Sequence, residues 1–181
     1  MKGLMLIKEN FELCEALITI DLLRRADIVI DTISLNDELR VMSQSNVEIK
    51  CDHLLKDIDL NDYSFLIIPG GKAVFNYHIN SDVTMGIIKH FNNHKQLIAC
   101  ICAAPMVLGK MGLLDNKPFV CYPGCETGIN GKYQKNKKVV INENIITSKG
   151  MGTTFEFAQA IITYVKDQET AKKVINSVYY G

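Results

Sequence analysis

The sequence has no excess of charge of either sign and no long hydrophobic run. Lysine and arginine together number 20, as do aspartate and glutamate, and the pI is near 6.9. This balance leaves no basic footprint for nucleic acid or for an anionic membrane, so we expect small neutral partners. The longest apolar stretches, around 64–69 and 97–104, are far shorter than the roughly 20 residues of a membrane span. We therefore expect neither a nucleic acid nor a membrane as partner.

We also expect neither a division into several domains nor a secretory signal peptide. No stretch rich in proline, glycine or serine interrupts the 181 residues, which predicts one domain over 1–181. Polar residues 8–10 cut off the N-terminal apolar run without a small-residue cleavage site, which predicts a cytoplasmic protein. In that compartment we expect reduced thiols rather than disulfides at the six cysteines, which are residues 14, 51, 100, 102, 121 and 125.

Strand-like and helix-like segments alternate along the chain. Short apolar runs predict strands at 1–8, 28–35, 47–51, 64–69, 96–101, 119–121, 139–141 and 145–148. Apolar residues at helical spacing predict helices at 12–26, 83–93, 105–111, 154–166 and 170–177. Such alternation predicts an α/β protein with a mostly parallel sheet and helices on both faces.

Cys102 lies between the predicted strand 96–101 and a helix-like segment, 103–109. A thiol at such a strand-to-helix turn is exposed at the end of the sheet, where a helix N-terminus favours the thiolate. Ligands of open α/β sheets bind beyond the carboxyl ends of the strands. The segment with Glu12 and Glu15 and the turn 70–71 end at that same edge, so we expect them to converge on Cys102.

Each of these residues also has a plain structural interpretation. Free cysteine is often a small buried residue, and Pro-Gly-Gly is common in simple turns. Glu15 follows the pattern of a solvated carboxylate on the polar face of a helix. In the functional interpretation, Cys102 is a nucleophile, and backbone N–H groups at Gly70 and Gly71 stabilise negative charge on a ligand oxygen. The residues alone leave both interpretations open.

Several motifs follow one another in a specific order. They are ELCEA at 12–16, DLLRRA at 21–26, IIPGG at 67–71, ACICAAP at 99–105, CYPG at 121–124 and TSKGMGTTFEFA at 147–158. Together they resemble the ThiJ/PfpI superfamily, and within it the DJ-one-like subgroup, over nearly the whole chain. The resemblance implies a flavodoxin-like three-layer sandwich and a homodimer, and no cofactor or metal is expected.

The resemblance also implies roles for individual residues. Cys102 matches the reactive cysteine of the family and Glu15 the carboxyl group that hydrogen-bonds it. Because a charged Glu15 would raise the pKa of the neighbouring thiol, a reactive Cys102 requires a protonated Glu15, and the two groups titrate as a pair. The residues expected to form the oxyanion or substrate-binding site are Gly70, Gly71, Ala103, Tyr122 and Arg25.

Two departures from the pattern disfavour proteolysis. The peptidase branch of the superfamily has a histidine directly after the nucleophile, where this chain has Ala103. The vertebrate-type subgroup has a histidine where this chain has Tyr122, and tyrosine, with an ordinary pKa of about 10, is a poor base near neutral pH. We expect solvated or edge positions for the four histidines, residues 53, 78, 90 and 94.

The resemblance then implies a cysteine-dependent enzyme that acts on small reactive dicarbonyls. In this hypothesis Cys102 attacks an aldehyde, Glu15 moves a proton between adjacent carbons, and methylglyoxal becomes lactate without glutathione, an activity also described as deglycation. The alternative is a non-enzymatic redox sensor or stress-protective chaperone, in which peroxide oxidises Cys102. The same thiol supports both hypotheses.

The remaining cysteines and one arginine suggest further roles, for which the sequence gives less support. Four thiolates, from 100, 102, 121 and 125, could bind zinc, but their spacings differ from the usual Cys-x2-Cys knuckle. We expect Cys100 to be a buried strand residue or at most a resolving thiol. In the family an arginine pair from both subunits lines an anion pocket; Arg25 matches one position, and Asn46 or a neighbour stands at the other.

Overall fold

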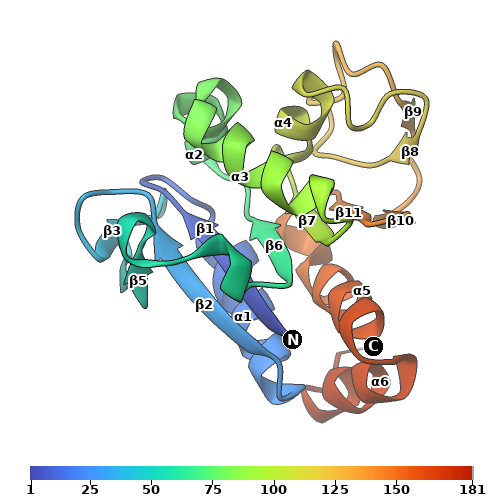
Figure 1. Cartoon of the computed structure of the whole chain (residues 1–181). Helices are drawn as coiled ribbons and strands as arrows, with labels where there is room; N and C mark the ends of the chain where they lie inside the picture. Colours follow the sequence, from blue (N-terminus) through green and yellow to red (C-terminus); the bar gives the residue numbers. More distant parts are fainter. Residues whose placement is uncertain (181) are drawn as a thin grey trace.

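The computed structural model describes residues 1–180 and has a seven-stranded sheet at its centre (Figure 1). The strand order is β10-β11-β7-β6-β1-β2-β5, and every neighbouring pair is parallel except β10 with β11. The strands are β1 (Lys2–Ile7), β2 (Val29–Ser34), β5 (His53–Leu54), β6 (Phe65–Ile68), β7 (Leu97–Ile101), β10 (Val139–Asn142) and β11 (Ile145–Ser148). The predicted mostly parallel sheet is confirmed.

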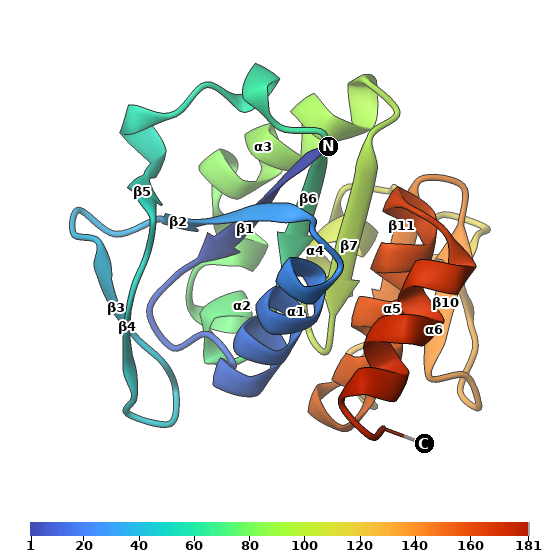
Figure 2. The same cartoon turned by 90° about the horizontal axis from the view of Figure 1, so that it is seen from below.

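Helices cover both faces of this sheet (Figure 2). One face carries α1 (Leu13–Arg25), α5 (Thr154–Val165) and α6 (Gln168–Ser177), and the other carries α2 (Lys72–Asn76), α3 (Asp82–Asn93) and α4 (Pro105–Lys110). Short 3-10 turns occur at Leu55–Asp57, Leu60–Asp62, His78–Asn80 and Met151–Thr153. The three-layer arrangement is the predicted one. Within residues 1–180, no helix combines the length and the apolar character needed to cross a membrane.

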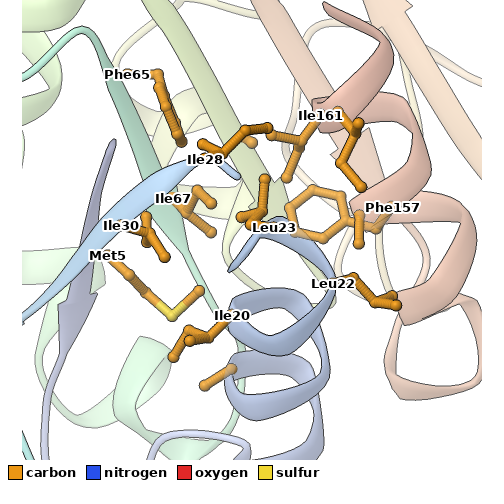
Figure 3. Packing of buried hydrophobic residues seen from close by; sticks show 14 of the residues in the cluster. Met5, Ile20, Leu22, Leu23, Ile28, Ile30, Phe65, Ile67, Phe157 and Ile161 are labelled. Atoms are coloured by element: carbon orange, nitrogen blue, oxygen red, sulfur yellow. The ribbon is translucent and has the colours of Figure 1, made fainter. Parts of the chain in front are cut away.

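Side chains on the two faces of each central strand belong to two separate hydrophobic clusters. In β1, Met5 packs with α1 and α5, whereas Leu4 packs with α3 and α4. Figure 3 shows Leu23 of α1 against Phe157 of α5 in the first cluster. Fully burying such a side chain stabilises the fold by roughly 1.5–3 kcal/mol. A one-residue slip would exchange the two faces, so this alternation fixes the register of the strands that lead to the site.

Three local predictions need correction. The strand expected at 47–51 is β4 (Glu48–Lys50), which pairs only with β3 (Arg40–Met42) in a separate antiparallel hairpin outside the main sheet. The strand expected at 119–121 is β8 (Pro118–Phe119), which pairs with β9 (Lys132–Tyr133), also outside the main sheet. The sequence pattern did not predict α2. These elements are two to five residues long, too short for a periodic apolar pattern.

Candidate active site

The loops after β1, β6 and β7 meet at the carboxyl ends of the strands around one cavity of about 620 Å³. Five of the seven predicted site residues line it, namely Glu15, Gly71, Cys102, Ala103 and Tyr122. An isolated backbone bridge from Phe11 to Gly71 ties the first loop to the second. The predicted convergence of these segments is therefore confirmed.

The backbone at Cys102 is held in a left-handed conformation, with φ of 64°. For a residue other than glycine this conformation costs on the order of 1 kcal/mol or more. Two hydrogen bonds fix it: the Cys102 N–H donates to Ser148 O at 3.0 Å, and the Cys102 carbonyl accepts from Tyr122 N–H at 2.8 Å. The thiol is thus presented on a turn that β11 and the loop after β8 hold in place.

The expected helix-terminus effect on this thiol is not supported. Helix α4 begins at Pro105, three residues after Cys102, and spans only six residues. Its dipole is therefore short and does not start at the sulfur. Local N–H groups take its place, because the backbone N–H groups of Ala103 and Gly71 interact with the thiol and favour its charged form.

Glu15 is buried in the cavity wall rather than solvated, with 1% of its surface exposed. Its Oε2 accepts a hydrogen bond of 2.7 Å from the Gly70 N–H, and Oε1 has no hydrogen-bond partner among residues 1–180. A Cβ atom at Gly70 would lie 2.5 Å from Cys102 Cβ and 2.8 Å from Glu15 Oε2. Only glycine at this position lets the carboxyl group and the thiol approach each other.

Burial raises the pKa of Glu15 to about 7. The Gly70 N–H and a hydrogen bond with the Cys102 thiol oppose this effect, and the charge of Glu12 adds to it. Burial also raises the pKa of the Cys102 thiol, and the neighbouring Glu15 carboxylate raises it further. Each group disfavours a second negative charge on the other. A Cys102 thiolate is therefore disfavoured while Glu15 is charged, and the expected thiolate beside a protonated Glu15 stays a prediction.

The expected oxyanion residues divide into two kinds. Gly71, whose φ is 93°, and Ala103 direct backbone N–H groups toward the thiol. The Gly70 N–H is instead taken by Glu15, so Gly70 positions the carboxyl group and leaves the oxyanion role to its neighbours. Tyr122 lies at the cavity mouth with 55% of its surface exposed.

Arg25 is not part of the cavity within this chain. It lies in the last turn of α1, at the opposite end of the helix from Glu15, and forms an exposed ion pair of 2.8 Å with Asp21. Its predicted role depended on a second subunit, and it stays a prediction.

No histidine lines the cavity, but one histidine prediction is wrong. His53 and His94 are exposed and His90 is half-buried, as expected. His78, however, is 1% exposed, and its Nδ1 lies 3.1 Å from Thr84 Oγ1. Burial lowers its pKa to about 4. The 3-10 turn that follows α2 carries this side chain into the interior, where the polar character of histidine is met by the threonine hydroxyl.

The sequence pattern did not identify several cavity residues. Gln44 reaches the cavity from the β3–β4 hairpin and hydrogen-bonds Glu12, and Lys72 donates its backbone N–H to Gln44 Oε1 at 3.1 Å. Cys125 also lines the cavity, whereas Cys100 is fully buried in β7, as expected for a strand residue. Cys125 directly follows the CYPG motif, which was a usable signal, but nothing local marks Gln44.

Comparisons with known proteins agree with this geometry. Residues 1–164 match the sequence model of the DJ-1/PfpI family. The chain is 32% identical to the protein dj-1beta of Drosophila melanogaster over 174 residues, covering 95% of this chain and 93% of the relative. It is 29% identical over 173 residues to the Caenorhabditis elegans protein named glutathione-independent glyoxalase DJR-1.2, covering 95% and 92%. The crystal structure of Drosophila DJ-1beta has a TM-score of 0.93 at 31% identity, covering 99% and 98%.

Proposed function

Because the chain belongs to the DJ-1/PfpI family, as its motifs predicted, we propose that it converts small reactive dicarbonyls without glutathione, with methylglyoxal as the simplest substrate. One observation carries the proposal: the Cys102 thiol and the Glu15 carboxyl group flank Gly70 at a cavity of about 620 Å³. A relative at 29% identity is named a glyoxalase, which supports the same chemistry. Deglycation of early dicarbonyl adducts would use the same two groups.

The first step forms a bond between Cys102 Sγ and the aldehyde carbon. The thiol proton passes to the aldehyde oxygen, and the product is a hemithioacetal. The N–H groups of Gly71 and Ala103, which already interact with the sulfur, are suited to stabilise the developing oxygen charge. No external reductant or oxidant is needed.

The second step moves a proton from the former aldehyde carbon to the neighbouring carbonyl carbon. Glu15 accepts it and returns it, since a carboxyl group with a pKa of about 7 exchanges protons in both directions at neutral pH. The hydroxyl proton on the sulfur-bearing carbon passes to the oxygen of the neighbouring carbon, so the hemithioacetal becomes the thioester of a 2-hydroxy acid. Water then cleaves the C–S bond, which releases lactate and restores the thiol.

Peptide hydrolysis fits the cavity poorly. A cysteine peptidase needs a base that activates the thiol and later protonates the leaving amine, usually a histidine. Ala103 occupies the position next to the nucleophile, and no histidine is among the residues that line the cavity. Glu15 alone would have to serve as both base and acid.

The test is lactate production from methylglyoxal in the absence of glutathione. We expect turnover by the wild type, and a loss of at least about a hundredfold in Cys102→Ser and in Glu15→Gln. Cys14→Ser is the matched control, because Cys14 neighbours Glu15 in the sequence but does not line the cavity. Undiminished lactate production by Cys102→Ser would sink the assignment.

The redox hypothesis rests on the same thiol and has one supporting feature. The N–H groups of Gly71 and Ala103, together with a protonated Glu15, could hold the oxygens of a sulfinate on Cys102. Two peroxide molecules would oxidise the thiol in succession and leave as water. A selective gain of two oxygens on Cys102 by intact mass, with a negligible glyoxalase rate, would favour a sensor or stress-protective protein over an enzyme.

We also propose that the chain forms a homodimer in the cytoplasm. Family resemblance supports the dimer, and in that setting Arg25 of one copy would approach the cavity of the other. Light scattering on the purified protein tests the mass, and fractionation of cells tests the compartment. A monomer at micromolar concentration would remove the proposed role of Arg25.

A further inference from the structure

The cavity contains a second carboxylate, Glu12, which has no part in the proposed reaction. Glu12 occupies the N-cap position of α1, yet its side chain makes no capping hydrogen bond. It lines the cavity instead, where the side-chain amide of Gln44 donates to its Oε2. Gln44 is in turn held by the backbone N–H of Lys72 at 3.1 Å. The hairpin thus fixes a carboxylate, which the helix itself does not use, in the lining of the cavity that Cys102 also lines.

Within the described chain, no cation pairs with this carboxylate. Among residues 1–180, Glu12 forms no ion pair, and its one side-chain partner is a neutral amide. It lies one helical turn before Glu15 on the same helix, and its charge acts on the Glu15 carboxyl group. The cation of the cavity lining, Lys72, has an exposed side chain. A ligand that reaches Cys102 therefore passes a carboxylate that is held in place and that no cation of its own chain pairs with.

The rest of the cavity lining is largely apolar and exposed. Phe75, Tyr122 and Met151 have 53%, 55% and 55% of their surfaces exposed, although each lines the cavity. Exposed apolar side chains gathered at a cavity commonly mark a ligand surface. Methylglyoxal presents only a methyl group beyond its two carbonyls and would leave most of this surface uncovered.

From these observations we infer that Glu12, fixed by Gln44, is a selectivity residue that disfavours anionic carbonyl compounds, so the site takes neutral 2-oxoaldehydes with an apolar substituent. The inference rests on the proposed function for its substrate class. The charge filter itself concerns any small reagent that approaches Cys102. It can therefore be tested separately from turnover.

The test compares two alkylating reagents of nearly the same size, neutral iodoacetamide and anionic iodoacetate. Their rates at Cys102 are measured by mass spectrometry with peptide mapping and divided by their rates at a cysteine peptide. In the wild type we expect the amide to be favoured by about tenfold or more, because a carboxylate in the cavity lining repels the anionic reagent. In Glu12→Gln this preference should fall to about twofold.

Two further variants guard against misfolding and nonspecific effects. Gln44→Ala keeps the charge but releases the Glu12 side chain, so its preference should be intermediate. Glu143→Gln removes a carboxylate paired with Lys117 in the turn between β10 and β11, at the other edge of the sheet, and should behave as wild type. An equal reagent preference in the wild type and Glu12→Gln would overturn the charge filter.

Turnover then tests the substrate class with phenylglyoxal, methylglyoxal and 4-carboxyphenylglyoxal. We expect kcat/KM to be highest for phenylglyoxal, and about tenfold lower for its anionic derivative in the wild type but not in Glu12→Gln. Equal use of both aryl substrates by the wild type would overturn the inference. Turnover of none of the three would contradict the proposed function, while the alkylation result would still decide whether Glu12 acts as a filter.

Discussion

Two carboxylates of this chain, the half-buried Asp31 of β2 and the buried Glu15 of α1, have opposite electrostatic surroundings. Asp31 of β2 receives Lys2 Nζ at 2.7 Å and the Tyr63 hydroxyl at 2.9 Å, with His53 Nε2 at 3.4 Å. Burial alone would raise the pKa of Asp31, but Lys2 and Tyr63 outweigh it and the pKa is lowered. Glu15 is opposed only by neutral groups, the Gly70 N–H and the Cys102 thiol, and has no cation, so burial dominates and its pKa rises to about 7.

The difference separates a stabilising carboxylate from a reactive one. A carboxylate with several donors and a cation stays ionised and does not take up a proton near neutral pH. A carboxylate with an orphaned oxygen is costly when charged, and it holds a proton that it can transfer. Shifted pKa values of the second kind, in a cavity and beside a thiol, are typical of catalytic sites.

The largest expected effect comes from filling the space between Glu15 and Cys102. In Gly70→Ala the new Cβ would overlap Cys102 Cβ, which we expect to lower the free energy of unfolding by about 3 kcal/mol and to abolish turnover. Urea denaturation and the lactate assay measure both. Gly86→Ala is the control, because no atom lies within 4 Å of that Cβ, and alanine in α3 should stabilise the protein by about 0.5–1 kcal/mol.

Removing the charge of Glu15 should stabilise the protein at alkaline pH. The folded pKa is raised, so the wild type loses stability as pH rises from about 4.5 to about 7, and Glu15→Gln does not. At pH 8.5 we expect the variant to be more stable by up to about 3 kcal/mol, with a difference near zero at pH 4.5. Urea denaturation at both pH values checks this, and a variant less stable than wild type at pH 8.5 would contradict the buried-charge argument.

Neutralising Asp31 should change the stability of the protein in the opposite direction. Folding lowers the pKa of Asp31, so the charged carboxylate stabilises the wild type at pH values above the pKa that Asp31 has in the unfolded chain. Asp31→Asn removes that stabilisation. We expect a loss of about 1–2 kcal/mol at pH 7, which shrinks as pH falls below 4. If Asn at position 31 proved neutral at pH 7, the contrast between the two carboxylates would fail.

The smallest expected effect concerns the pH dependence of turnover. Glu12 is a minor contributor to the raised pKa of Glu15, so Glu12→Gln should move the acid limb of the kcat/KM profile to lower pH by a few tenths of a unit. Glu143→Gln should leave the profile in place. A shift to higher pH in Glu12→Gln would mean that the Glu12 charge does not reach Glu15.

The sequence predicted the features that are determined by neighbouring residues in the chain. Long periodic segments such as 154–166 identified their helices, and Cys102 was located because strand 96–101 and helix 105–111 flank it directly. The roles of Glu15 and Gly71 came from the family motifs, since a carboxylate on a helix looks the same whether it faces solvent or a cavity.

What the sequence missed depends on contacts made far along the chain. The position of Gln44 is set by a hairpin of two three-residue strands, and the burial of His78 is set by a turn with no periodic pattern. The helix-terminus argument at Cys102 failed for a related reason. It assumed that α4 begins at the thiol, whereas the turn 102–104 intervenes.

The left-handed backbone at Cys102 means that the protein carries its thiol at a cost in stability. Glycine would adopt φ of 64° without strain, so the fold by itself would tolerate or even prefer a residue with no side chain at this turn. The strain is retained together with the thiol. Random drift of this chain toward greater thermal stability would therefore favour glycine at this turn, and the chemistry proposed for Cys102 is what would keep cysteine there.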